Sequence, residues 1–325
     1  MTTNSIKLFS FFNIPSYSNG LFNEFCVFNS IYNKYLLICK TEDKKGLIIF
    51  DLIIFEIIKK IDNLHKDIIL CLKHYLKNNK DIIITSSWDN VMNIIDVNKN
   101  FEIIKVIKNV GDTDYSGDYS IYSFILLNDY IISNNYDDRY LKIFDYNSCK
   151  FIKNIFNQTC GIGYIDFYYD KNKNKNYIIT CNRDYYYSNV KSYSFEDECL
   201  YQIYTNRVVY NIVINIIKKK INIIFCSHEQ ILFYDFHNGD CLDILEFKDY
   251  KFNTILFFNN EYIISGGYKE IFIINFYEKK IVQKIKCHQN EIFNLKNIKI
   301  NNYEYLFTQA IGNDKIIIWK NNQQL

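Results

Sequence analysis

The feature that most limits the fold is a short apolar run that recurs seven times along the 325-residue chain. Most copies end in an aromatic residue or Ile, followed by Asp or a close substitute, and such runs predict buried β-strands. The penultimate residues are 40 to 49 positions apart, with a mean of (319 − 50)/6, about 45. The copies are LIIFD (47–51), MNIID (92–96), LKIFD (141–145), VKSYS (190–194), ILFYD (231–235), IFIIN (271–275) and IIIWK (316–320).

Each copy has the same surroundings. A strand with a small or polar tail precedes it, as in DIIITSS (81–87), and a further apolar run follows it, as in FEIIKVI (101–107). A fourth, alternating run such as KFNTILFF (251–258) then opens the next repeat. The sequence therefore predicts seven units of four strands, and a period near 45 is typical of β-propeller repeats.

This pattern resembles the WD-repeat (WD40) β-propeller family over nearly the whole chain. The repeats are degenerate, because Trp-Asp never occurs at the repeat position and Trp319 is followed by Lys320. Kelch propellers are the rival family, but they require Gly-Gly after the second strand of each blade, and only Gly266-Gly267 fits. The resemblance implies an all-β, seven-bladed β-propeller of four-stranded antiparallel blades.

The last repeat supplies only three strands, so the missing strand must come from elsewhere in the chain. SIKLFSFF (5–12) has no other assignment, and in WD propellers the N-terminal strand completes the last blade. Closure of this kind would also cover an exposed sheet edge. We expect one domain over 1–325, with blades at 21–58, 68–107, 119–155, 162–204, 208–247, 252–286, and 292–319 plus 5–12.

The resemblance also implies a structural hydrogen-bonded network within a blade. In the family it joins a His before the inner strand, a Ser or Thr on the second strand, an Asp in the turn and the repeat Trp. The second repeat has His65, Thr85 and Asp89, but Ile95 replaces the Trp. The last repeat carries the full set, at His288, Thr308, Asp314 and Trp319.

Composition and motifs argue against several function classes. Lys and Arg number 38 and Asp and Glu 36, so the net charge of +2 gives no global field that would attract nucleic acid. The ten Cys form no C-x-x-C pair, the five His form no cluster with metal-ligand spacing, and no phosphate-binding loop or nucleophile motif occurs. No run is long enough to span a membrane. We expect a non-enzymatic protein with no metal and no cofactor, located in the cytoplasm or the nucleus.

The candidate partner site is one face of the propeller. In WD propellers this face is built from the turns between second and third strands and from the loops that enter first strands. All three arginines of the chain fall in such loops, in three adjacent repeats, and aromatic residues accompany them. Tyr, Trp and Arg are the residue types of binding hot spots. The predicted partner-binding residues are Trp88, Tyr136, Arg139, Arg183, Tyr185 and Arg207.

Two alternatives remain open. Tyr is abundant in this chain, so these loops could be ordinary solvated turns. The loops of the opposite face carry Lys runs at 77–80, 171–176 and 218–220, which could bind an anionic lipid or RNA. The preferred interpretation is a protein-interaction scaffold that binds a protein or peptide within a multiprotein complex. This interpretation rests on the fold analogy and on the arginine-bearing loops.

Overall fold

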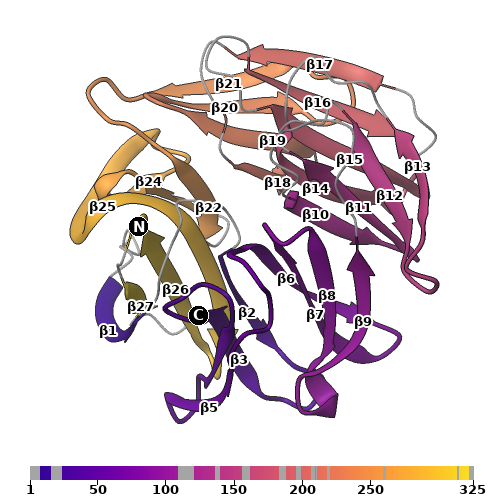
Figure 1. Cartoon of the computed structure of the whole chain (residues 1–325). Coiled ribbons are helices and arrows are strands. Elements are labelled where there is room, and N and C mark those ends of the chain that lie inside the picture. The colour runs from indigo at the N-terminus through magenta and orange to yellow at the C-terminus, as the bar shows by residue number, and fades with distance from the viewer. Residues whose placement is uncertain are drawn as a thin grey trace.

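The computed structural model of the protein describes residues 8–15, 24–108, 121–135, 140–155, 162–182, 188–194, 199–205, 209, 211–217, 220–258, 261–312 and 315–321. Regular structure in these residues is almost entirely β: 27 strands and one short 3-10 helix at Val97–Lys99. The sheets follow one another in chain order around a common centre (Figure 1). The predicted all-β propeller is therefore confirmed.

Five of the sheets are antiparallel and have four strands each, one for each of the first five repeats. The first two are β2 (Phe25–Asn29), β3 (Tyr35–Lys40), β4 (Leu47–Asp51) and β5 (Glu56–Ile61), then β6 (Ile69–Lys77), β7 (Lys80–Ser87), β8 (Val91–Asp96) and β9 (Glu102–Lys108). The third and fourth are β10 (Ile121–Leu127), β11 (Tyr130–Asn135), β12 (Leu141–Asp145) and β13 (Phe151–Ile155), then β14 (Ile162–Asp170), β15 (Lys175–Asn182), β16 (Ser188–Ser194) and β17 (Cys199–Thr205). The fifth is β18 (Ile212–Ile217), β19 (Lys220–Ser227), β20 (Gln230–Asp235) and β21 (Cys241–Glu246).

The sixth and seventh blades share one long strand. Their seven-stranded sheet has the order β1-β27-β26-β25-β24-β23-β22. The shared strand is β25. Its first 7 residues, from Lys280, pair with β24, and its stretch from Ile292 to Ile300 pairs with β26. Counting β25 in both blades gives the predicted seven blades of four strands. The strands are β1 (Leu8–Pro15), β22 (Thr254–Phe258), β23 (Tyr262–Gly266), β24 (Tyr268–Asn275), β25 (Lys280–Ile300), β26 (Tyr303–Ala310) and β27 (Lys315–Asn321).

The ring closes through the N-terminal strand, as predicted. β1 pairs antiparallel with β27, from Leu8 opposite Asn321 to Pro15 opposite Lys315. The two ends of the colour scale accordingly meet in one sheet in Figure 1. The strand ends three residues later than the predicted 5–12. Leu8 and Ile14 are buried, whereas Phe9 and Phe11 are about half exposed, at 52% and 47%.

The core lies between neighbouring blades, because successive side chains of a strand point to opposite faces of the sheet. On β7, Ile82 and Ile84 pack with Phe124 of the third blade, and Ile83 packs with Ile38 of the first. Middle strands are therefore buried on both faces and need the unbroken apolar runs seen in the sequence. The exposed apolar residues are concentrated on outer strands such as β5 and β9.

A buried polar contact joins the first two blades at the end of β6. His74 Nε2 lies 2.8 Å from Asp81 Oδ1, and Asp81 Oδ2 accepts a hydrogen bond from the Ile31 amide at 2.8 Å. The His74 ring stacks on Phe28, with 3.7 Å between ring centroids. Burial lowers the pKa of the His74 imidazole, and the hydrogen bond and charge of Asp81 oppose this shift only in part.

This contact predicts a loss of stability in mild acid. Because the folded pKa of His74 lies below its ordinary value of about 6.5, the unfolded chain takes up a proton first as the pH falls. Stabilisation by neutral His74 is complete above about pH 6.5 and declines below it. We expect the free energy of unfolding to fall less between about pH 7 and pH 5 in His74→Gln than in the wild type. Urea titrations at both pH values measure this difference, and equal declines would contradict it.

Candidate functional site

The predicted partner site is represented in the structure by one of its six residues. Trp88 is described, and its side chain is 43% exposed. It lies in the turn between β7 and β8, on the predicted face. The other five, Tyr136, Arg139, Arg183, Tyr185 and Arg207, lie outside the described residues. The described part of the predicted site therefore consists of Trp88 and the residues around it.

A buried network fixes the turn that carries Trp88. His65 Nε2 lies 2.8 Å from the Thr85 hydroxyl, and His65 Nδ1 lies 3.0 Å from Asp89 Oδ2. The amides of Lys66 and Val91 donate to the same carboxylate at 2.8 and 3.1 Å. Burial raises the pKa of Asp89, but the hydrogen bond and charge of His65 outweigh it, and the net pKa is lowered. An ionised Asp89 therefore ties the turn, through Val91, to the loop before β6, through His65 and Lys66.

Asn93 completes this network in the place where sequence reasoning found only Ile95. Asn93 lies directly opposite Thr85 in the β7–β8 pairing, whereas Ile95 lies opposite Ile83. The Asn93 side-chain amide donates to the Leu64 carbonyl at 3.1 Å and lies 3.2 Å from His65 Nε2. The one signal in the sequence was the polar Asn inside an apolar strand. The second blade is thus held by four polar side chains without a Trp.

The backbone on both sides of Trp88 is also anchored. The Trp88 amide donates to the Ile68 carbonyl at 3.0 Å. The Ser87 hydroxyl donates to the Asp67 carbonyl at 2.9 Å and accepts from the Asp89 amide at 3.1 Å. The indole is therefore a partly exposed aromatic group on a fixed support. Such a group loses little conformational entropy when a partner covers it.

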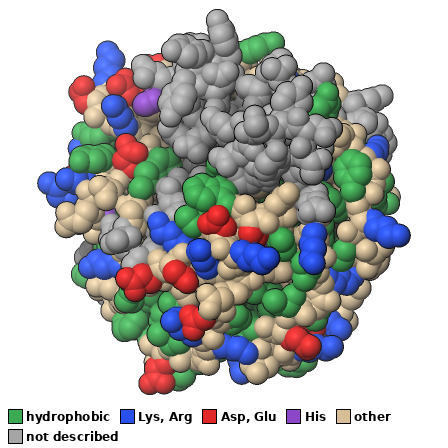
Figure 2. All heavy atoms as spheres, in the orientation of Figure 1, with side chains coloured by type: hydrophobic (Ala, Val, Ile, Leu, Met, Phe, Trp, Pro, Cys, Tyr) green, Lys and Arg blue, Asp and Glu red, His purple; other side chains and the backbone are tan. Residues whose placement is uncertain are grey.

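Lysines of the first two blades lie close to this turn. The turn after β3 bonds to the loop before β6, because the His65 and Ile69 amides donate to the carbonyls of Lys45 and Lys44 at 3.0 and 2.8 Å. Lys45 Nζ also donates to the Lys66 carbonyl at 3.0 Å. Burial is the main cause that lowers the pKa of Lys44, and the nearby charge of Lys40 lowers it further. In Figure 2, basic and acidic side chains are interspersed over the described part of the face in view.

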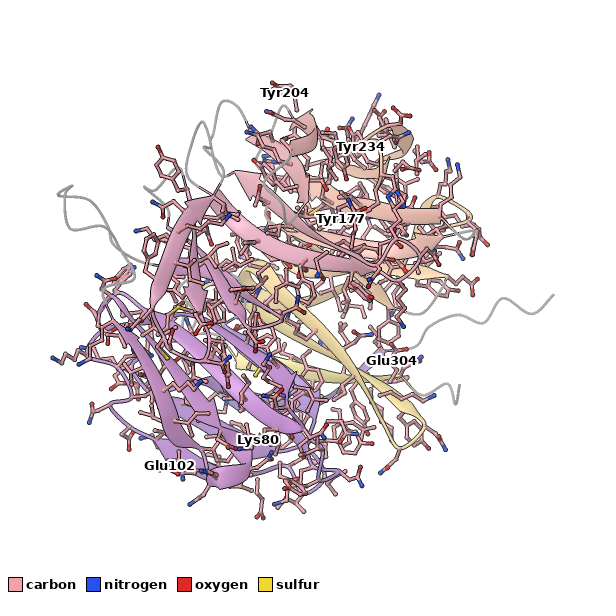
Figure 3. All side chains as sticks on the ribbon, turned by 90° about the vertical axis from the view of Figure 1, so that its right-hand side faces the viewer. Lys80, Glu102, Tyr177, Tyr204, Tyr234 and Glu304 are labelled. Atoms are coloured by element: carbon pink, nitrogen blue, oxygen red, sulfur yellow. The ribbon has the colours of Figure 1, made fainter. Side chains whose placement is uncertain are left out.

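A pocket of about 350 Å³ lies farther round the same face, between the fourth and fifth blades. Tyr204 and Thr205, at the end of β17, line one side, and the turn from Ser227 to Gln230 lines the other. Tyr204 is 74% exposed, and the lining continues along β20 to Tyr234, which is labelled on the same side of the molecule in Figure 3. The face therefore offers a second exposed aromatic residue and a hollow beside it.

The predicted network of the last blade is seen in three of its four members. His288 Nε2 lies 2.8 Å from the Thr308 hydroxyl, and the Trp319 indole N–H donates to that hydroxyl at 3.0 Å. All three side chains are buried. Asp314 lies outside the described residues. These two contacts join β25, β26 and β27, so they support the fold.

Other classes of site find little support in the described residues. No group of three or more His, Cys, Asp or Glu side chains is arranged there to hold a metal ion. The nine cysteines in the described part of the chain are unbridged, and Cys181 and Cys226 are buried in strands as expected. Among the described residues no helix is long and apolar enough to cross a membrane.

Comparisons with known proteins give no family assignment. No model of a known protein family matches the chain, and no curated protein matches its sequence.

Proposed function

We propose that this chain is a WD-repeat-type β-propeller that acts as a non-catalytic interaction scaffold and binds a protein or peptide on the face that carries Trp88. The observation that carries the proposal is the exposed indole on a turn fixed by His65, Thr85 and Asp89. Two blades contain His–Thr contacts of the kind that the family resemblance implies. Both contacts serve the fold, which leaves the loops of this face for recognition.

The chemistry of the face suits a peptide better than a small molecule. A rigid Trp supplies apolar area, and the neighbouring lysines, together with the arginines predicted in adjacent loops, can pair with carboxylates. Acidic residues such as Asp43 and Asp67 lie in the same loops, so the surface is of mixed charge. We therefore infer a ligand with both apolar and acidic side chains, as part of a multiprotein complex.

Binding of anionic lipid or RNA to the opposite face is the alternative. Of its lysines, Lys77 forms an ion pair with Asp129 at 2.7 Å, and Lys173 Nζ lies 3.1 Å from His237 Nδ1. Lys80 is exposed at this end of β7 (Figure 3). Because part of this charge is used within the protein, the opposite face is the weaker candidate.

Replacing Trp88 tests the proposal. Truncation of a central aromatic anchor costs about 2 kcal/mol or more, or roughly a thirtyfold loss of affinity. We expect Trp88→Ala to lose specific partners in an affinity pull-down from the native cells, quantified by mass spectrometry. The melting temperature should stay nearly unchanged, because the indole is partly exposed and the network below it is intact.

Tyr277→Ala is the matched control. Tyr277 is 59% exposed and lies between β24 and β25, on the opposite face. This variant should keep the partners that Trp88→Ala loses. If Trp88→Ala keeps every partner while Ala at Lys80, Lys171 and Lys175 removes binding to anionic vesicles or RNA, the functional face is the opposite one.

A further inference from the structure

The register of strand pairing brings one position of every innermost strand to the same level of the central channel. In each blade, the repeat aromatic position of the third strand pairs with one residue of the second strand. The next residue along the second strand pairs with the position in question on the innermost strand. In the last blade, for example, Trp319 pairs with Leu306, and the next residue, Phe307, pairs with Lys296. We call these seven residues the channel ring. They are Cys26, Lys73, Ile125, Asp166, Val213, Leu256 and Lys296.

The channel ring holds two lysines and one carboxylate. Lys73, Asp166 and Lys296 come from the second, fourth and seventh blades, and all three line one cavity of about 250 Å³. None of the three belongs to a motif that the sequence pattern reveals. Formal charges of +2 and −1 leave the ring with a net charge of +1 at neutral pH. All three side chains are only partly exposed, so the net charge is incompletely solvated and favours a counter-ion.

The single carboxylate already accepts two hydrogen bonds from its own strand. The Tyr164 hydroxyl donates to Asp166 Oδ2 at 3.2 Å, and the Phe167 amide donates to Asp166 Oδ1 at 2.9 Å. Lys73 Nζ donates to the Ile165 carbonyl at 3.3 Å and lies 5.7 Å from the centre of the Tyr164 ring. These contacts hold a cation and a carboxylate in place on two different blades.

The two lysines act on each other through the cavity. Burial lowers the pKa of Lys296, and the charge of Lys73 is the second contribution in the same direction. Asp166 raises the pKa of Lys296 but does not cancel these contributions. An anion placed between the two ammonium groups would remove their mutual repulsion and accept hydrogen bonds from both.

We propose that the central cavity binds a small multivalent oxyanion of the phosphate class between Lys73 and Lys296. The cavity is smaller than the roughly 300 to 1,000 Å³ of sites for drug-sized ligands, which favours a small ion over a peptide segment. Two lysines from blades that are not adjacent in the ring would be bridged by this ion. This proposal does not depend on the proposed scaffold function.

Isothermal titration calorimetry with sodium pyrophosphate and sodium phosphate tests the proposal, on protein dialysed into phosphate-free buffer at constant ionic strength. We expect wild-type protein to bind at least one of the two anions. Lys73→Met and Lys296→Met should each weaken binding by about tenfold or more, because each removes a charge-assisted hydrogen bond. Asp166→Asn should strengthen binding, because it removes the one negative charge of the ring.

Lys286→Met is the matched control, since Lys286 is an exposed lysine of the outer part of β25. It should bind like the wild type. If Lys296→Met does not fold, Lys73→Met and Asp166→Asn still decide the matter, because they are expected to change affinity in opposite directions. The absence of measurable binding by the wild type, equal weakening by Lys286→Met, or weaker binding by Asp166→Asn would overturn the proposal.

Discussion

Deleting residues 1–15 is expected to turn a monodisperse protein into one that aggregates. The deletion removes β1 and leaves the apolar strand β27 as an open sheet edge, which can pair with another chain. It also removes the buried side chains of Leu8 and Ile14, and truncating a buried aliphatic residue costs about 2 to 5 kcal/mol. Together these losses approach the whole stability of a typical domain, about 5 to 15 kcal/mol. Size-exclusion chromatography with light scattering measures the outcome.

Phe9→Ser separates loss of the strand from loss of exposed apolar surface. Phe9 is 52% exposed, and its backbone pairs with Lys320 in the wild type. The variant keeps β1, so it should remain monodisperse with a melting temperature close to the wild type. A soluble deletion variant with an unchanged melting temperature would show that β1 is not needed to close the ring.

Replacing Thr308 by Val should cost about 2 to 6 kcal/mol of unfolding free energy. The change is nearly isosteric, but it removes the hydroxyl that accepts from the Trp319 indole at 3.0 Å and contacts His288 at 2.8 Å. Two buried polar groups then lose their common partner, and each such loss costs about 1 to 3 kcal/mol. Urea denaturation followed by Trp fluorescence gives the free energy.

Thr308→Ser is the control, because it keeps the hydroxyl and removes only a methyl group. It should recover most of the stability that Thr308→Val loses. If Thr308→Val is as stable as the wild type while Thr308→Ser is destabilised, the hydroxyl contacts contribute nothing, and the cost lies in packing alone. The same pair of changes at Thr85 would test the network of the second blade through the His65 contact.

The sequence predicted the ring and its closure because both follow from a local pattern repeated at a fixed spacing. Seven copies of one strand type set the number of blades. The last repeat lacked one strand, and the unassigned strand near the N-terminus matched it. The continuity of β25 could not be predicted in this way. Tyr268 pairs with Glu291 across the junction, so long-range pairing extends the strand through a stretch that was expected to separate 252–286 from 292–319.

The residues of the candidate sites are brought together by pairing between strands, which a local sequence pattern does not reveal. Asn93 was overlooked because the repeat was aligned on its aromatic end, two residues away, and only the register with Thr85 reveals its part in the network. Lys73, Asp166 and Lys296 are far apart in the chain, and pairing on three separate blades brings them to one cavity. The role of the arginine-bearing loops stays a prediction, because Arg139, Arg183 and Arg207 lie outside the described residues.

The pairing of β1 with β27 has a consequence for synthesis of the protein. Ser10 pairs with Trp319, so the two partners are 319 − 10 = 309 residues apart and β1 leaves the ribosome long before β27 exists. At roughly 5 to 20 residues per second, β1 waits about 15 to 60 s for its partner. During that time a strand with three phenylalanines, Phe9, Phe11 and Phe12, has no sheet to join. The strand that closes the finished ring therefore exposes apolar side chains in every nascent chain. A chaperone would be most useful at this strand.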